Sequence, residues 1–240
     1  MNIKNHLRSI LNFFHLDLSK NLEYDRLTKQ IMHRLIKSNS NCIDVGCHKG
    51  GILKSILKLS PKGKHFAFEP IPILYNQLKL KYTNRASIFP YALSDKSGES
   101  SFQYVKNAPA YSGIKKRKYD IASPAIEEIK VELRTLDEII PGDTKIDFIK
   151  IDVEGGEFGV LKGAKDLLKT SQPIVIFECG LGASDYYGTK PTDIYNFITL
   201  EIGLKVATLK SYIKKDKSLS LNDFKGYFET GKEYYFVAFP

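Results

Sequence analysis

Residues 41–51 read NCIDVGCHKGG, a short apolar run that ends in an aspartate and a glycine-rich turn. The residues that follow, 50–59, place their apolar side chains at helical spacing, so the segment predicts a strand, a tight loop and a helix. Gly46 and Gly50 lack a Cβ atom and let a ligand approach the backbone. The free N–H groups at the helix N-terminus attract an anion. The spacing D-x-G-x-x-x-G lacks the second glycine of the dinucleotide motif, and a turn that only joins strand to helix is the alternative.

The same alternation of short apolar runs and amphipathic runs continues along the chain. We predict strands at residues 65–68, 87–93, 100–105, 146–151, 174–179, 205–209 and 234–239, and helices at residues 22–37, 72–82, 157–168 and 192–201. This order predicts βαβ units and an α/β fold with a mainly parallel, doubly wound sheet. In such a sheet the ligand binds beyond the carboxyl ends of the strands, so residues directly after each strand are candidates for the site.

Two charged side chains lie in or directly after these predicted strands. Glu69 follows the second strand, where a carboxylate can accept hydrogen bonds from both ribose hydroxyls of an adenosine ligand. Lys150 interrupts the apolar run of residues 146–151. Because a buried ammonium group is costly unless paired, we expect a carboxylate partner on a neighbouring strand, Asp44 or Glu178. The alternative is a lysine whose stem reaches solvent.

An acidic cluster follows that central strand and completes a recognisable set of motifs. The segments are Asp44-Val45-Gly46, Phe68-Glu69-Pro70, Leu93-Ser94-Asp95, residues 149–155 (IKIDVEG) with Glu157 two positions later, and Phe177-Glu178. In this order they resemble the FkbM family of methyltransferases over about residues 41–180. The resemblance implies a Rossmann-like class I methyltransferase fold with an antiparallel C-terminal strand, S-adenosylmethionine as the cofactor, and methyl transfer, commonly to oxygen, on sugars, polyketides or other small molecules.

The resemblance also implies which residues form the site. Its cofactor-binding residues are Asp44, Gly46, Gly50, Glu69, Leu93, Asp95 and Asp152. For accepting the proton of an acceptor hydroxyl we expect Asp152 first, Glu154 second and His48 third. The family often carries asparagine where this chain has His48. We expect no metal, and carboxylates holding a divalent cation are the alternative.

Composition sets the remaining expectations. The chain has 36 Lys and Arg against 27 Asp and Glu, a net charge of +9, with one basic run at residues 115–118 (KKRK). An RNA methyltransferase that uses this basic surface is a rival hypothesis, although no nucleic-acid motif is present. A non-catalytic adenosine-binding protein on the same fold is a third. We expect a small-molecule or glycan acceptor and leave the oligomeric state open.

The organisation of the chain is predicted as an N-terminal helical extension, residues 1–40, and a methyltransferase domain, residues 41–240. Residues 1–18 have the pattern of a basic amphipathic helix, which either packs across the domain, our preferred interpretation, or contacts an anionic membrane surface. Residues 106–130 break the alternation and are interpreted as a lid on the substrate side, or else as a plain surface loop. Three cysteines without a dense framework and the lack of a long apolar run favour a cytoplasmic protein.

Overall fold

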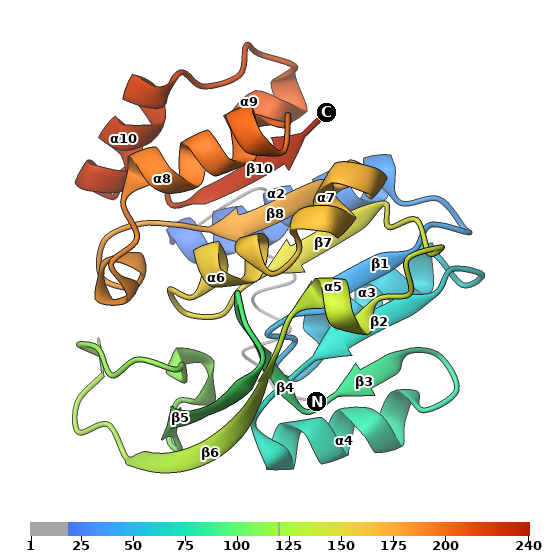
Figure 1. Cartoon of the computed structure of the whole chain (residues 1–240), viewed down its shortest axis with the longest axis vertical. Coiled ribbons are helices and arrows are strands. Elements are labelled where there is room, and N and C mark those ends of the chain that lie inside the picture. The colour runs from blue at the N-terminus through green and yellow to red at the C-terminus, as the bar shows by residue number, and fades with distance from the viewer. Residues whose placement is uncertain (1–18, 120) are drawn as a thin grey trace.

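The computed structural model describes residues 19–119 and 121–240, and within these residues seven strands form one main sheet in the order β3-β2-β1-β7-β8-β10-β9 (Figure 1). The pairs among β1, β2, β3, β7 and β8 are parallel, whereas β10 is antiparallel to both of its neighbours. This confirms the predicted fold class. The strands of the main sheet are β1 (Cys42–Val45), β2 (His65–Phe68), β3 (Ser87–Phe89), β7 (Phe148–Ile151), β8 (Ile174–Glu178), β9 (Lys205–Thr208) and β10 (Tyr235–Phe239).

Helices cover both faces of this sheet (Figure 1). One face packs against α2 (Lys20–Leu35), α3 (Gly51–Leu59), α4 (Pro72–Tyr82) and α9 (Leu209–Lys214). The other packs against α5 (Leu136–Ile139), α6 (Glu157–Lys162), α7 (Lys165–Ser171), α8 (Pro191–Asn196) and α10 (Leu221–Thr230). Buried side chains on both sides explain why neither face of the central strands meets solvent.

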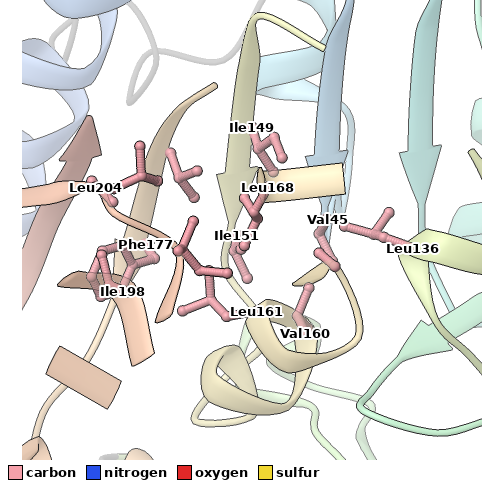
Figure 2. Packing of buried hydrophobic residues seen from close by; sticks show 14 of the residues in the cluster. Val45, Leu136, Ile149, Ile151, Val160, Leu161, Leu168, Phe177, Ile198 and Leu204 are labelled. Atoms are coloured by element: carbon pink, nitrogen blue, oxygen red, sulfur yellow. The ribbon is translucent and has the colours of Figure 1, made fainter. Parts of the chain in front are cut away.

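The central strands carry different chemistry on their two faces. The face toward α6, α7, α8 and α10 is apolar along its whole length, and Figure 2 shows Val45, Ile149, Ile151 and Phe177 in this core. Each fully buried side chain of this kind stabilises the fold by about 1.5–3 kcal/mol. This core provides the rigid support on which the other face depends.

The opposite face of β7 and β8 is apolar toward the amino ends of these strands, where Phe148 and Ile176 pack in the cluster that includes α2. Toward the carboxyl ends it becomes ionisable. The strand register pairs Asp44 with Lys150 and Glu178 with Tyr235, and it therefore places these side chains on one face. The sheet thus concentrates its charged groups at the edge where a parallel sheet binds ligands.

A smaller sheet of β4 (Tyr91–Leu93), β6 (Ile126–Arg134) and β5 (Gly98–Val105) lies beside the main sheet. Two expectations for this region were wrong. The single strand expected at residues 87–93 is divided at Pro90 between the two sheets, because proline cannot donate a ladder hydrogen bond. The loop expected at residues 106–130 ends at residue 125, because β6 begins at Ile126 and pairs with β5.

Other expected elements differ in their bounds. The helix expected at residues 157–168 is two helices, α6 and α7, because Gly163 lies close to the Ser94 carbonyl and ends the first. The last turn of the helix at residues 192–201 is π-helical. Helices α9 and α10 were not expected. The helix expected at residues 1–18 lies outside the described residues, and no described helix is long and apolar enough to span a membrane.

Candidate active site

The glycine turn after β1 and the acidic segment after β7 are in direct contact. Asp152 donates its backbone N–H to the carbonyl of Val45 at 3.0 Å. Gly46 has φ +74°, and a Cβ atom there would lie 1.9 Å from the Asp152 carbonyl oxygen. Gly46 is therefore required by the close approach of the Asp152 backbone.

A cavity of about 580 Å³ opens where these segments meet. Six of the predicted site residues line it: Gly46, His48, Glu69, Leu93, Asp152 and Glu154. Much of the remaining wall is apolar and comes from β2, β4 and the loop before β6. An apolar wall with a few polar groups is typical of a site for a small-molecule ligand.

Three predicted cofactor residues lie outside the lining of this cavity. Asp44 is buried beneath the N-terminal end of α3. A Cβ atom on Gly50 would meet Leu78 of α4 at 2.7 Å, so this glycine serves helix packing. Asp95 forms a partly exposed ion pair with Lys162 at 2.5 Å. We therefore expect no direct contact between these three residues and a ligand in this cavity.

Glu69 lines the cavity and also holds its loops together. One carboxylate oxygen accepts the backbone N–H of His48 at 2.7 Å, and the other accepts that of Ile71 at 3.0 Å. Burial raises the pKa of Glu69 to about 7, against the lowering effect of these two hydrogen bonds. Each oxygen keeps a further lone pair, so the predicted hydrogen bonds to ribose hydroxyls remain compatible with this geometry.

His48 enters the cavity from a backbone with φ +47°. This left-handed conformation favours asparagine and histidine over most residues, so histidine fits the position at which the resemblance implies asparagine. Its Nε2 atom is buried and has no hydrogen-bond partner among the described residues. Burial and Lys49 lower the pKa of His48 while Asp152 opposes them, so the imidazole is uncharged at neutral pH.

A second, larger cavity of about 1380 Å³ shares Asp152 and Glu154 with the first. Asp152 is fixed through one oxygen, Oδ2, which accepts hydrogen bonds from Lys150 Nζ at 3.0 Å and from the Tyr235 hydroxyl at 2.7 Å. Its Oδ1 has no hydrogen bond to any residue that the structure describes. Lys150 is paired as expected, but with Asp152, directly after its own strand, rather than with Asp44 or Glu178.

The loop between β5 and β6 forms a wall of both cavities. Arg117, within the basic run, pairs with Glu154 and lies 5.5 Å from the ring of Tyr111 and 5.8 Å from that of Tyr119. Its side chain is 9% exposed, so the run is not simply a solvated basic surface. Glu154 itself has φ +59°, a strained conformation of the kind that collects at functional sites. This placement agrees with the substrate-side interpretation of the loop.

Sequence reasoning missed Tyr235 and Arg117 as site residues. Tyr235 begins a strand that reads as ordinary core, YYFVAF, and only the sheet order brings it beside Asp152. Arg117 belongs to a run whose other members gave no reason to single it out. Neither residue belongs to a sequence motif that would mark it as part of the site.

Buried and half-buried carboxyl groups outnumber cations around the two cavities. The carboxyl groups are Asp44, Glu69, Asp152, Glu154, Glu157 and Glu178, and the cations among them are Lys150 and Arg117. Glu157 accepts the backbone N–H groups of Val153 and Gly155 and so holds the acidic turn. The first cavity is lined by three of these carboxyl groups, Glu69, Asp152 and Glu154, and by neither of the two cations, which favours a positively charged ligand there. In the described part of the chain, no three His, Cys, Asp or Glu side chains are grouped in an arrangement that could hold a metal ion.

These carboxyl groups make stability depend on pH. Burial raises the pKa of Asp44, Glu69 and Glu157 to about 7 and that of Glu154 to about 8, whereas the unfolded chain titrates near about 4. The folded state then binds more protons between these values, so the free energy of unfolding falls as the pH rises from about 5 to about 8. Thermal unfolding across this range should show a falling melting temperature, and a rise would contradict the assignment.

Comparison with known proteins gives a consistent result. A family model described as "Methyltransferase FkbM domain" matches residues 44–205. The chain is 27% identical over 162 residues to 2-O-methyltransferase NoeI of Sinorhizobium fredii, which covers 60% of this chain and 65% of NoeI. It is 25% identical over 162 residues to Methyltransferase sdnD of Sordaria araneosa, which covers 55% of this chain and 62% of sdnD.

A solved structure shares the fold. The crystal structure of Methyltransferase FkbM from Methylobacillus flagellatus KT superposes with a TM-score of 0.53 at 14% sequence identity, over 91% of this chain and 52% of that chain. At this identity the likeness concerns the fold alone. The chain spans less than two thirds of the length of NoeI, of sdnD and of this crystallised protein.

Proposed function

Since the chain belongs to the FkbM family of methyltransferases, which implies S-adenosylmethionine as the cofactor, we propose that it transfers a methyl group from S-adenosylmethionine to a hydroxyl oxygen of a sugar, glycan or other small molecule. The observation that carries this proposal is the meeting of two cavities at Asp152 and Glu154. The first would hold the cofactor and the second the acceptor. A transfer between two ligands needs such a shared boundary.

The first cavity fits the cofactor on three counts. Its wall offers an apolar surface for the adenosine, Glu69 has free lone pairs for the ribose, and His48 Nε2 is a buried polar atom without a described partner. The surplus of carboxyl groups suits a sulfonium cation. When bound, the cofactor supplies an electrophilic methyl group on positively charged sulfur.

The chain's own residues orient the acceptor and take its proton. The free Oδ1 of Asp152 accepts the proton of the acceptor hydroxyl as the acceptor oxygen gains the methyl group. Lys150 and Tyr235 hold Oδ2 of Asp152. Glu154 is engaged by Arg117, so we assign it to anchoring the loop and keep Asp152 as the base. Most of the rate then comes from positioning and from exclusion of water.

The basic run gives no separate support to the RNA hypothesis. Arg117 lines the second cavity and pairs with Glu154. A small acceptor is therefore retained in the proposal.

Ligand binding tests the cofactor assignment. S-adenosylhomocysteine should raise the melting temperature, while NAD at the same concentration should not. The binding affinity for S-adenosylmethionine should rise relative to that for S-adenosylhomocysteine between pH 6 and pH 8.5. The reason is that ionisation of Glu69 and Glu154 favours the positively charged ligand. Stabilisation by NAD alone would contradict the proposal. Incubation with labelled S-adenosylmethionine and fractionated cell extract would then identify the acceptor.

A further inference from the structure

Glu178 is a carboxyl group in the acceptor cavity that the proposed transfer does not use. It ends β8 directly beside Asp152, because the register pairs Ile151 with Phe177 and the next residues of both strands follow on one face. Neighbouring strands lie about 4.8 Å apart. No described residue forms a hydrogen bond or an ion pair with the Glu178 side chain. The cavity therefore presents two adjacent carboxyl groups, of which one is free to bind a ligand.

Aromatic rings form the wall beside this carboxyl pair. The ring of Tyr24 on α2 lies 4.8 Å from those of Tyr234 and Tyr235, and all three residues line the cavity. The Tyr24 hydroxyl donates to Glu233 at 2.7 Å and accepts the backbone N–H of Tyr234 at 3.2 Å, so its ring is fixed. Rigid rings with apolar faces suit a ligand that is itself a ring with apolar C–H faces and polar substituents.

The charges of the cavity favour a neutral ligand. Both of its cations are already paired, Lys150 with Asp152 and Arg117 with Glu154, and Asp25 in the same wall has an interaction of its own. Burial and the nearby carboxylates raise the pKa of Glu178 well above its usual range, which favours its protonated form. Pairing of both cations leaves no free cation in the described wall to attract a phosphate group. The protonated form of Glu178 does not attract an ammonium group and can both donate and accept hydrogen bonds.

We propose that Glu178 is a specificity-determining residue that binds the hydroxyl next to the reacting one, so that the acceptor is a neutral ring compound with hydroxyls on adjacent carbons. This inference rests on the proposed function, in which Asp152 takes the proton of the reacting hydroxyl. Two hydroxyls on adjacent carbons match two carboxyl groups on adjacent strand ends. Glu178 binds one of these hydroxyls and leaves the other to Oδ1 of Asp152.

The experiment compares three probes of the same ring size: cis-1,2-cyclohexanediol, cyclohexanol and cyclohexylamine. Binding to the full chain in the presence of S-adenosylhomocysteine is measured by ligand-observed NMR, and methyl ether formation with S-adenosylmethionine is measured in parallel. We expect the diol to bind about fivefold to tenfold more tightly than cyclohexanol, as expected for one further hydrogen bond. Glu178→Ala should reduce this ratio to about one, and Glu178→Gln should keep part of it, because an amide also donates.

Glu229→Gln on α10 is the matched control, since Glu229 is exposed and, among the described residues, forms its ion pair with Lys225 of the same helix. This variant should keep the wild-type ratio. Equal binding of diol and cyclohexanol to the wild type, an unchanged ratio in Glu178→Ala, or tighter binding of cyclohexylamine would each overturn the inference. Failure of S-adenosylhomocysteine to bind, with diol selectivity still dependent on Glu178, would instead remove the proposed function and leave Glu178 as a diol-binding residue.

Discussion

Asp152→Asn should lower the rate of methyl transfer by about 10²–10⁴-fold while S-adenosylhomocysteine binds almost as tightly as before. The amide cannot accept the hydroxyl proton, and proton transfer to a positioned group contributes this range in enzymes. The cofactor cavity keeps its shape, because the part of this residue that contacts Gly46 is its backbone. Steady-state kinetics and calorimetric titration with S-adenosylhomocysteine measure the two effects separately.

Tyr235→Phe provides a second variant that leaves the Asp152 carboxylate intact. It removes the 2.7 Å hydrogen bond to Oδ2, and we expect a fall in kcat of about tenfold with a smaller change in KM. Asp143→Asn, on the exposed turn before β7, is the control and should leave kcat unchanged. Wild-type turnover in Asp152→Asn would show that another group takes the proton.

Gly46→Ala should destabilise the protein by about 2–5 kcal/mol, combining the cost of a left-handed backbone with that of a steric clash. The added Cβ atom would lie 1.9 Å from the Asp152 carbonyl oxygen, and this neighbour is backbone that cannot rotate away. Relief of the clash has to separate the turn after β1 from the segment after β7. Chemical denaturation measures the loss, and cofactor affinity should fall with it.

Gly51→Ala is the matched control from the same loop. Nothing lies within 4 Å of a Cβ atom at Gly51, which is the first residue of α3. Alanine there should be neutral or stabilise by about 0.4–1 kcal/mol, because it lowers the entropy of the unfolded chain. Equal stability of the two variants would show that the contact between the two segments contributes nothing to the free energy of unfolding.

The sequence predicted the layers of the fold because each of its signals is local. Alternating apolar runs mark the strands of the main sheet, and glycine and proline mark their ends. A signal for β6 was also present, since Ile129, Val131 and Leu133 repeat at the period of two residues that strands require. Because this segment follows the basic run closely, its first residues were assigned to the loop. The division at Pro90 was likewise readable, because proline interrupts a ladder wherever it occurs.

The site was predictable only where its residues follow strands of the parallel sheet. Gly46, Glu69 and Asp152 come together because the carboxyl ends of β1, β2 and β7 share an edge. Tyr235 comes from a strand that runs the opposite way, so its first residue and not its last reaches this edge. Tyr24 arrives from a helix whose docking no motif encodes. Long-range placement of this kind depends on packing, which single-sequence patterns do not report.

The insertion of β10 between β8 and β9 has a consequence for how the protein matures on the ribosome. Every other strand of the main sheet precedes β10 in the chain, and β9 pairs with no other described strand. Until residues 235–239 have left the exit tunnel, β9 has no partner and Asp152 lacks the hydroxyl that holds it. The parallel strands can therefore pair before synthesis of the chain ends, whereas the hydrogen bond between Tyr235 and Asp152 forms only when β10 joins the sheet.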